Sequence, residues 1–243
     1  MLYEVVFDWK RMPDRDLNRS VVVVADILRA TTVMIRALQN GARDILPQEN
    51  DADARSLLQQ MKEQGEPVLL CGEKEGFKRP GYDLGNSPLE FTPERVKDHS
   101  IIHLTTNGTR AMKAAQGAQE ILIAAFSNMS AVAEELRQLE DNSEHILFVV
   151  SGREGEYCIE DTVCLGGIVL ELLQPPGRSV CINDAGRTAV DLFQIYRGDL
   201  ISMLRQSYHG RYLEEMGLGE DIPECARLDT TDRVPRMSQG RVK

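Results

Sequence analysis

The apolar residues of this chain fall into short runs that alternate with helical patterns. Strands are predicted where the runs are rich in β-branched residues, at 2–7, 21–25, 44–47, 67–71, 101–104, 121–125 and 145–150. Helices are predicted at 31–39, 51–64, 111–115, 128–139, 159–173, 183–208 and 207–216. Strands that alternate with helices predict an α/β protein with a largely parallel sheet.

Two stretches of the chain repeat the same order of features. Residues 21–46 and residues 101–122 each contain an apolar strand, a polar turn with threonines, a helix, a Gly-Ala pair, and an acidic residue followed by Ile-Leu. A glycine between a helix and a strand is typical of an αβ turn. The pattern predicts an internal duplication of a βαβ unit, with both polar turns at carboxyl ends of strands, where open α/β sheets bind ligands.

The length and composition of the chain favour a globular protein. A chain of 243 residues with 42% hydrophobic and 27% charged residues is typical of a globular domain, so we expect one catalytic α/β domain over 1–243, or two intertwined halves. No run is long enough to span a bilayer, and the N-terminus lacks a secretion signal, so a cytoplasmic location without membrane contact is expected. The five cysteines form no CxxC pair, which favours reduced thiols.

The net charge of −10 argues against a nucleic-acid partner, because such a surface is normally basic. It does not exclude a small anionic ligand. Positive potential for such a ligand must then come from local arginines, helix N-termini or a metal ion.

The turn Thr105-Thr106-Asn107-Gly108-Thr109 lies between a predicted strand and a predicted helix. Unpaired N–H groups and the dipole at a helix N-terminus favour an anion there, hydroxyl groups add donors, and Gly108 permits close approach. Thr106, Asn107, Gly108 and Thr109 are therefore candidate substrate-binding residues. An ordinary capped βα turn is the alternative, and no Walker sequence occurs in the chain.

A second polar turn follows the apolar run at 21–25. Asp26 offers a carboxylate that suits Mg²⁺, and Arg29 can make bidentate contacts to phosphate or sulfonate. Thr31 and Thr32 add hydroxyl groups at a helix start. The alternative is that Asp26 caps the helix and that Arg29 pairs with it at the surface.

Further polar residues follow other predicted strands. Glu73 closes a third strand, Arg153 follows a fourth, and Glu160 and Asp161 open a helix. Acids in a first helical turn are commonly dipole partners, but one rim of a parallel sheet would gather all these groups. Carboxylates, arginines and hydroxyls without a histidine motif indicate metal-assisted transfer or hydrolysis at an anionic centre. His103, inside a strand, is interpreted as a core histidine.

Five strings in this order resemble the 2-phosphosulfolactate phosphatase family. They are DILRATT at 26–32, CGE at 71–73, GYDLGNSP at 81–88, TTNGT at 105–109, and GREG at 152–155 with EDT at 160–162. Weaker similarity extends to Asp221-Ile222 and Cys225-Ala226. The resemblance implies a three-layer α/β/α fold and an Mg²⁺-dependent phosphatase that cleaves the phosphate monoester of 3-sulfolactate, a step of coenzyme M biosynthesis in methanogens.

The resemblance also suggests roles for the candidate residues. Asp26, Arg29 and Glu73 would be catalytic, and Asp26, Glu160 and Asp161 would hold Mg²⁺, with Glu73 a further possible ligand. Arg29 and Arg153 would clamp phosphate and sulfonate. Whether Asp26 is a covalent nucleophile stays open. Leu28 departs from the D-x-D-x-T spacing of aspartyl-phosphate phosphatases, which disfavours this role without excluding it. The substrate-binding set would be Thr31, Thr32, Thr106, Asn107, Gly108, Thr109 and Arg153.

Two alternatives to this function remain. A non-catalytic binding protein for small phosphorylated or sulfonated metabolites needs the same turns and arginines without turnover. A kinase or transferase would need a nucleotide site, and the chain has neither a P-loop nor a Rossmann glycine fingerprint. A homo-oligomer is a general expectation.

Overall fold

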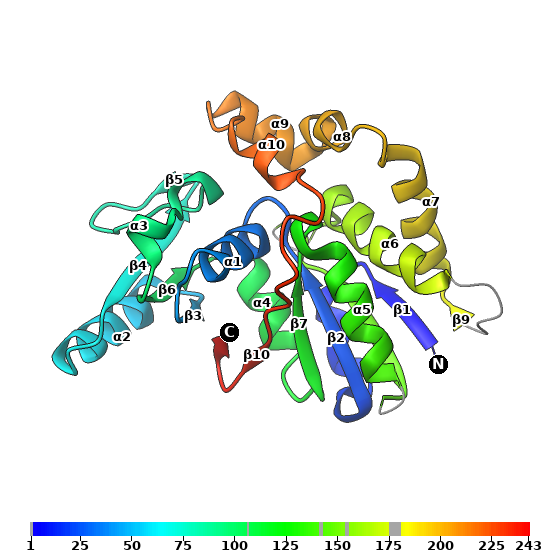
Figure 1. Cartoon of the computed structure of the whole chain (residues 1–243), viewed down its shortest axis with the longest axis horizontal. Helices are drawn as coiled ribbons and strands as arrows, with labels where there is room; N and C mark the ends of the chain where they lie inside the picture. The colour runs from blue at the N-terminus through cyan, green and yellow to red at the C-terminus, as the bar shows by residue number, and fades with distance from the viewer. Residues whose placement is uncertain (1, 106, 141–142, 154–155, 175–180) are drawn as a thin grey trace.

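Two β-sheets form the framework of the computed structural model, which describes residues 2–105, 107–140, 143–153, 156–174 and 181–243 (Figure 1). The five-stranded sheet is parallel throughout, and the six-stranded sheet is mixed. The first has the order β7 (Glu120–Ala124), β2 (Ser20–Ala25), β8 (His145–Val150), β1 (Leu2–Val6), β9 (Cys181–Ile182). The second has the order β10 (Met237–Ser238), β11 (Arg241–Val242), β3 (Asp44–Gln48), β6 (Ser100–Leu104), β4 (Val68–Lys74), β5 (Phe77–Lys78).

The α/β class is confirmed, but the expectation of one largely parallel sheet is corrected to two sheets. Each predicted βαβ unit divides its strands between them. The chain leaves the five-stranded sheet from β2 through α1 (Ala30–Gln39) to β3, and it returns from β6 through α4 (Asn107–Ala114) to β7. Periodicity along the chain identifies strands but not their partners, which explains the difference. The duplication itself stays a prediction.

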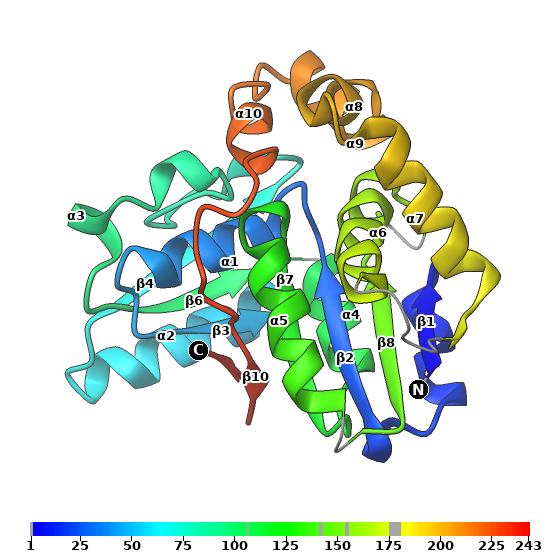
Figure 2. The ribbon, with the colours of Figure 1, turned by 45° about the vertical axis from the view of Figure 1, so that its right-hand side comes forward.

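Helices pack on both sheets. α5 (Met129–Leu139), α6 (Ile159–Leu173) and α7 (Asp184–Tyr196) pack against the five-stranded sheet. Figure 2 shows α5 and α6 in front of β2 and β8, with α4 behind them. The 3-10 helix η1 (Trp9–Asp14) packs on α4 and β1, and α2 (Asp51–Glu63) packs on β4 and β6.

The continuous apolar strands form the core. Val21 to Val24 of β2 are fully buried, as expected for a central parallel strand covered on both faces. The main hydrophobic cluster contains Val22 of the first sheet and Ile101 of the second, so the two sheets share it. A smaller cluster fills the space under α2.

The C-terminal region connects the two sheets. Residues predicted as one helix at 183–208 form α7 and α8 (Leu200–Gln206), followed by α9 (Tyr208–Glu215) and α10 (Asp221–Cys225). The segment after α10 then runs along β7, where Ile123 donates to the carbonyl of Pro235 at 2.9 Å, and Val242 of β11 pairs with Ile45 of β3. Two-residue strands carry no periodic signal, so the sequence did not predict β10 and β11.

Short elements complete the chain. The loop at 72–93 contains the end of β4, β5 and the 3-10 helix η3 (Pro88–Glu90), followed by α3 (Pro93–Val96). The remaining 3-10 helices are η2 (Leu17–Arg19) and η4 (Phe126–Asn128). Among the described residues, no helix combines the length and apolar character needed to cross a membrane.

Candidate active site

A cavity of about 190 Å³ lies where loops from the two sheets meet. Asp26 and Arg153 reach it from the carboxyl ends of β2 and β8, and Thr105 reaches it from that of β6. His209 and Tyr212 of α9 also line it. Ligands of open α/β sheets bind outside the carboxyl ends of the strands, so this is the candidate active site. The other lining residues are Leu28, Arg29, Ala30, Glu73, Glu75, Gly76, Asn86 and Asn107.

Asp26 is the first residue after β2, and its carboxylate lies buried at the start of α1. Oδ1 accepts the N–H of Ala30 at 3.2 Å, and the backbone of Gly108 also bonds the carboxylate. Burial raises the pKa of Asp26 to about 6, with further contributions from the charges of Glu160 and Glu73 that these backbone bonds partly offset. The candidate acid is thus a desolvated carboxylate repelled by its neighbours.

Thr31 and Thr32 are buried, and neither lines the cavity. The Thr31 hydroxyl donates to the carbonyl of Asp26 at 2.9 Å and accepts the Asp26 N–H at 3.0 Å. The Thr32 hydroxyl donates to the carbonyl of Ile27 at 2.9 Å. Both hydroxyls therefore fix the loop that carries Asp26, and contact between them and substrate stays a prediction that this geometry does not favour.

Arg29 lines the cavity, but its guanidinium is committed to partners within the protein. Nη1 donates to Oδ2 of Asp221 at 2.5 Å, and Nη2 donates to the carbonyl of Gly76 at 2.7 Å. Both members of the ion pair are buried. Arg29 is therefore not the surface partner of Asp26 that the alternative interpretation requires; it connects the β2–α1 loop to α10 and to the β4–β5 turn.

The turn after β6 brings a helix N-terminus to the cavity. Asn107, the first residue of α4, and Thr105 both line it. Gly108 lies against Asp26, because a Cβ atom at this position would be 3.0 Å from Oδ2. Thr109 does not line the cavity, and its hydroxyl bonds that of Thr105 at 2.8 Å. Thr106 lies outside the described residues.

Glu73 reaches the cavity from β4. Its Oε2 accepts the N–H of Gly76 at 2.7 Å across the β4–β5 turn. The same turn bonds Arg29 through the carbonyl of Gly76. The structure therefore brings Asp26, Arg29 and Glu73, the three predicted catalytic residues, to one cavity.

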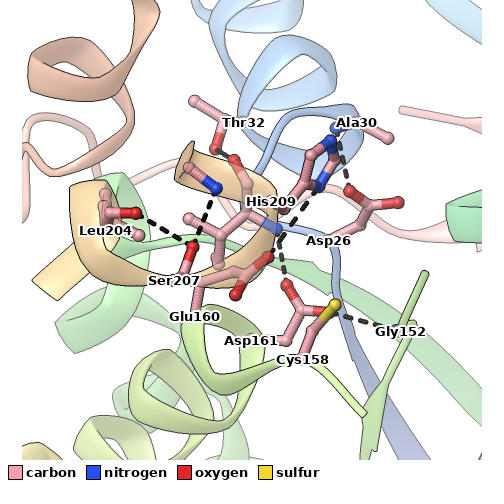
Figure 3. A network of polar contacts seen from close by, with 12 residues as sticks. Asp26, Ala30, Thr32, Gly152, Cys158, Glu160, Asp161, Leu204, Ser207 and His209 are labelled. Atoms are coloured by element: carbon pink, nitrogen blue, oxygen red, sulfur yellow. Dashed lines mark hydrogen bonds and ion pairs between the residues drawn. The ribbon is translucent and has the colours of Figure 1, made fainter. Parts of the chain in front are cut away.

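Glu160 and Asp161 open α6, and neither lines this cavity. Figure 3 shows both in a network of polar contacts near Asp26 and His209. Asp161 accepts the N–H of Ile27 at 2.8 Å and the N–H of Gly152 at 3.2 Å, one on each oxygen. Asp161 thus holds the loops after β2 and β8 together. Burial raises its pKa well above the ordinary value, and the charges of Asp26 and Glu160 add to this effect.

Glu160 is also buried, and burial raises its pKa. Its Oε1 lies 3.8 Å from Nδ1 of His209, and hydrogen bonds from Cys158 and Ser207 favour the charged carboxylate. Burial lowers the pKa of His209 to about 3, and the charges of Arg153 and Arg29 contribute. His209 is accordingly neutral near pH 7, and it lines the cavity while its Nδ1 faces Glu160.

The guanidinium of Arg153 contacts two aromatic rings of α9. Its guanidinium carbon is 4.2 Å from the ring centroid of Tyr212 and 5.2 Å from that of Tyr208. Its Nη1 is buried and makes no hydrogen bond within the described residues. A planar cation stacked on aromatic rings, with bonding capacity left over, suits an oxyanion.

The chain was compared with known proteins. The family model described as 2-phosphosulpholactate phosphatase matches residues 7–240. This chain belongs to the 2-phosphosulfolactate phosphatase family. A "Probable 2-phosphosulfolactate phosphatase" of Caldanaerobacter subterraneus subsp. tengcongensis is 35% identical over 243 residues, covering 100% of this chain and 98% of the relative. A protein of the same description from Symbiobacterium thermophilum is 39% identical over 230 residues, covering 95% of this chain and 96% of the relative.

The resemblance implies Mg²⁺, so the question is whether the carboxylates of this family member are suitable ligands for that ion. Among the described residues, no group of three or more acids, histidines or cysteines is arranged to hold a metal ion. Mg²⁺, however, is commonly held by one or two carboxylates together with water and substrate phosphate. Asp26 and Glu73 line one cavity and repel each other, so their oxygens fit a hard cation. Asp161 fits less well, because both of its oxygens accept backbone N–H groups.

Several residues of the family member's site were not predicted. Asn86 lines the cavity from the long loop at 72–93, and its Oδ1 lies 2.9 Å from Nε2 of His103. Burial lowers the pKa of His103 to about 3, so the neutral ring donates to Asn86. The predicted core histidine thereby positions a cavity residue, although its Nδ1 makes no bond within the described residues. The string GYDLGNSP was the only sequence signal for Asn86. The helix predicted at 207–216 corresponds to α9, but nothing in the sequence indicated that it lines the site.

Proposed function

We propose that this protein is an Mg²⁺-dependent phosphatase that hydrolyses 2-phosphosulfolactate, the phosphate monoester of 3-sulfolactate, to sulfolactate and inorganic phosphate. The observation that carries the proposal is the convergence of Asp26, Glu73, Arg29 and the α4 N-terminus on one cavity. Membership of the family gives the substrate class. We further propose a single catalytic domain, supported by the core that the two sheets share.

The charge of the cavity supports the need for a cation. Asp26, Glu73 and Glu75 contribute three carboxylates, whereas Arg29 is already paired with Asp221 and Arg153 adds one further positive charge. A phosphate dianion placed among these groups would be repelled unless positive charge were added. Asp26 and Glu73 would hold Mg²⁺, which when bound supplies charge neutralisation at the phosphate oxygens. Glu160 and Asp161 lie outside the cavity lining and would support the residues that hold Mg²⁺.

The protein's own residues would then bind and orient the phosphate. The N-terminus of α4, with Asn107, contributes backbone and amide donors at its positive end. The loop of Asp26 is fixed by the hydroxyls of Thr31 and Thr32, so the carboxylate stays in place. Charge stabilisation and positioning supply most of the rate acceleration in phosphoryl transfer.

The proposal is tested by phosphate release from 2-phosphosulfolactate and from other small phosphomonoesters, with Mg²⁺ and with EDTA. We expect release that requires Mg²⁺, and a loss of about 100-fold or more in Asp26→Asn. The matched control is Asp191→Asn, a change at an exposed residue of α7 that should leave the rate unchanged. Folded protein that releases no phosphate from any ester, yet binds sulfolactate, would support the non-catalytic binding protein instead.

A further inference from the structure

Asn86 is a neutral polar residue among the charged groups of the cavity. Its side chain is largely buried, and it lines the cavity together with Asp26 and Glu73. Within the described residues, the only hydrogen bond of this side chain joins Oδ1 to Nε2 of His103 at 2.9 Å. The amide nitrogen Nδ2 therefore has both of its N–H groups left for a ligand.

The backbone that carries Asn86 is held on both sides. Gly85, the residue before it, donates its N–H to Oε1 of Glu90 at 3.0 Å. Ser87, the residue after it, donates its hydroxyl to Oδ1 of Asp221. With the neighbouring residues fixed in this way, the rotation of the Asn86 amide is what remains to be set.

His103 of β6 sets that rotation. Its ring is fully buried against Phe91, and burial together with the charge of Arg29 lowers its pKa to about 3. The ring is therefore neutral near pH 7 and carries a single N–H. Nδ1 is buried without a partner in the described part of the chain, so a proton there would be a donor with no acceptor. The proton belongs on Nε2, which donates to Oδ1 of Asn86 and leaves the amide N–H groups for the cavity.

This direction decides what kind of ligand Asn86 suits. Mg²⁺ binds oxygen ligands, and the end of Asn86 that is free is its nitrogen, so the side chain suits an anion rather than the metal. The neutral amide also attracts phosphate without forming an ion pair with Asp26 or Glu73. A donor that is fixed in advance needs no reorganisation when charge develops on the phosphoryl oxygens.

On the basis of the function proposed above, we infer that the side-chain amide of Asn86 donates to the phosphate oxygens during hydrolysis, and that His103 positions this amide. Asn86 is then a catalytic residue, because it touches the reacting group. His103 is a positioning residue, because it acts through Asn86 and does not line the cavity.

The first test is Asn86→Ala, with hydrolysis of 2-phosphosulfolactate followed over a range of substrate and Mg²⁺ concentrations. We expect kcat to fall by about 100-fold or more, as for the loss of one preorganised donor. The Mg²⁺ concentration for half-maximal activity should stay within about twofold of that of the wild type, because the amide does not hold the metal. The matched control is Asn18→Ala, a change at an exposed residue of η2 that should leave kcat unchanged.

Asn86→Asp separates the donor from the shape of the side chain. Aspartate has nearly the same shape and can still accept from His103, so the fold should be kept, but it offers no N–H to the phosphate. We expect kcat to fall at least as far as in Asn86→Ala. Retained activity in Asn86→Asp would overturn the inference, and so would a loss in Asn86→Ala that high Mg²⁺ restores.

Two changes at His103 test its positioning role. His103→Gln places an amide N–H close to the position of Nε2, and it should keep kcat within about threefold, whereas His103→Leu should lower kcat by about tenfold. In the Asn86→Ala background, His103→Leu should lower kcat by no more than about twofold further, because the two residues act as one unit. Losses that multiply in the double variant would show that His103 does not act through Asn86.

Nitrogen NMR of the His103 ring tests the direction of the hydrogen bond without any turnover. The two ring nitrogens give distinct signals, and the proton should be found on Nε2. A proton on Nδ1 would overturn the inference, because the lone pair of Nε2 would then draw the N–H groups of Asn86 toward the ring and away from the cavity.

Calorimetry with inorganic phosphate in the presence of Mg²⁺ separates this inference from the proposed function. Wild-type protein that hydrolyses no ester but binds phosphate, with affinity about tenfold weaker in Asn86→Ala, would overturn the phosphatase and support the donor. Ester hydrolysis by the wild type with full kcat in Asn86→Ala would support the phosphatase and overturn the donor. Wild-type protein that neither hydrolyses esters nor binds phosphate would overturn both.

Discussion

Arg29 and Asp221 form a buried ion pair although they are 192 residues apart in the chain, with Nη1 of Arg29 2.5 Å from Oδ2 of Asp221. Asp221 also accepts a hydrogen bond from the hydroxyl of Ser87. One carboxylate of α10 thus joins the β2–α1 loop to the segment before η3. The C-terminal region therefore lines the cavity through α9, and through Asp221 of α10 it also fixes two segments next to the cavity.

Replacing Asp221 by alanine should destabilise the protein strongly. The change leaves the Arg29 guanidinium buried without its counter-charge, which costs about 3–5 kcal/mol in comparable pairs. The free energy of unfolding is measured by urea titration. The matched control is Asp191→Ala, which breaks an exposed pair with Arg187 and should have a far smaller effect. Equal losses in the two variants would contradict the structural role of Asp221.

Asp26→Asn should remove most turnover and yet stabilise the fold at neutral pH. The pKa of Asp26 is about 6 in the folded protein against an ordinary value of 3.8, mainly because of burial. Between these values the folded state binds more protons than the unfolded state, so this group's contribution to stability falls as the pH rises. Above about pH 6 the wild type contains a buried charge that asparagine lacks.

The measurement is Tm for wild type and Asp26→Asn at pH 4 and pH 8, in EDTA so that no metal compensates the charge. The advantage of the variant should be small at pH 4 and larger at pH 8. A difference in Tm that does not depend on pH would argue against the raised pKa of Asp26.

Gly108→Ala should reduce activity more than stability. The added Cβ would lie 3.0 Å from Oδ2 of Asp26 and 3.2 Å from Cβ of Ala30, closer than ordinary contacts, so the carboxylate must move. A displacement of a catalytic group by a fraction of an ångström lowers rates considerably. The control is Gly198→Ala, where nothing lies within 4 Å of the new atom. Full activity in Gly108→Ala would show that the position of Asp26 is not critical.

The dependence of activity on Mg²⁺ should distinguish the carboxylates. Glu73 lines the cavity, whereas Asp161 bonds two backbone N–H groups behind it. Glu73→Gln is therefore expected to raise the Mg²⁺ concentration for half-maximal activity by about tenfold or more, and Asp161→Asn to raise it less. Both variants are compared by Mg²⁺ titration at constant substrate. The reverse order would assign Asp161 to the metal, as the sequence predicts.

The order of apolar and polar residues along the sequence determined the main strands, some helices and the polar groups of the site. The apolar runs identified the main strands, and the helix predicted at 159–173 has the same bounds as α6. Polar residues at the ends of parallel strands meet at one rim, so Asp26, Glu73 and Arg153 were predicted to converge from their positions in the chain, and they line one cavity. These features depend on periodicity and on chain direction, both of which can be read along the sequence.

The tertiary structure decided which partners each residue has. It divided the strands between two sheets, paired Arg29 with Asp221, and placed Tyr212 on Arg153. It also turned the hydroxyls of Thr31 and Thr32 toward the backbone rather than toward the cavity. Contacts between segments far apart in the chain arise when apolar faces pack together, and no local pattern specifies them. The sequence therefore identified the chemical groups of the site, and packing determined which of them remain available to a ligand.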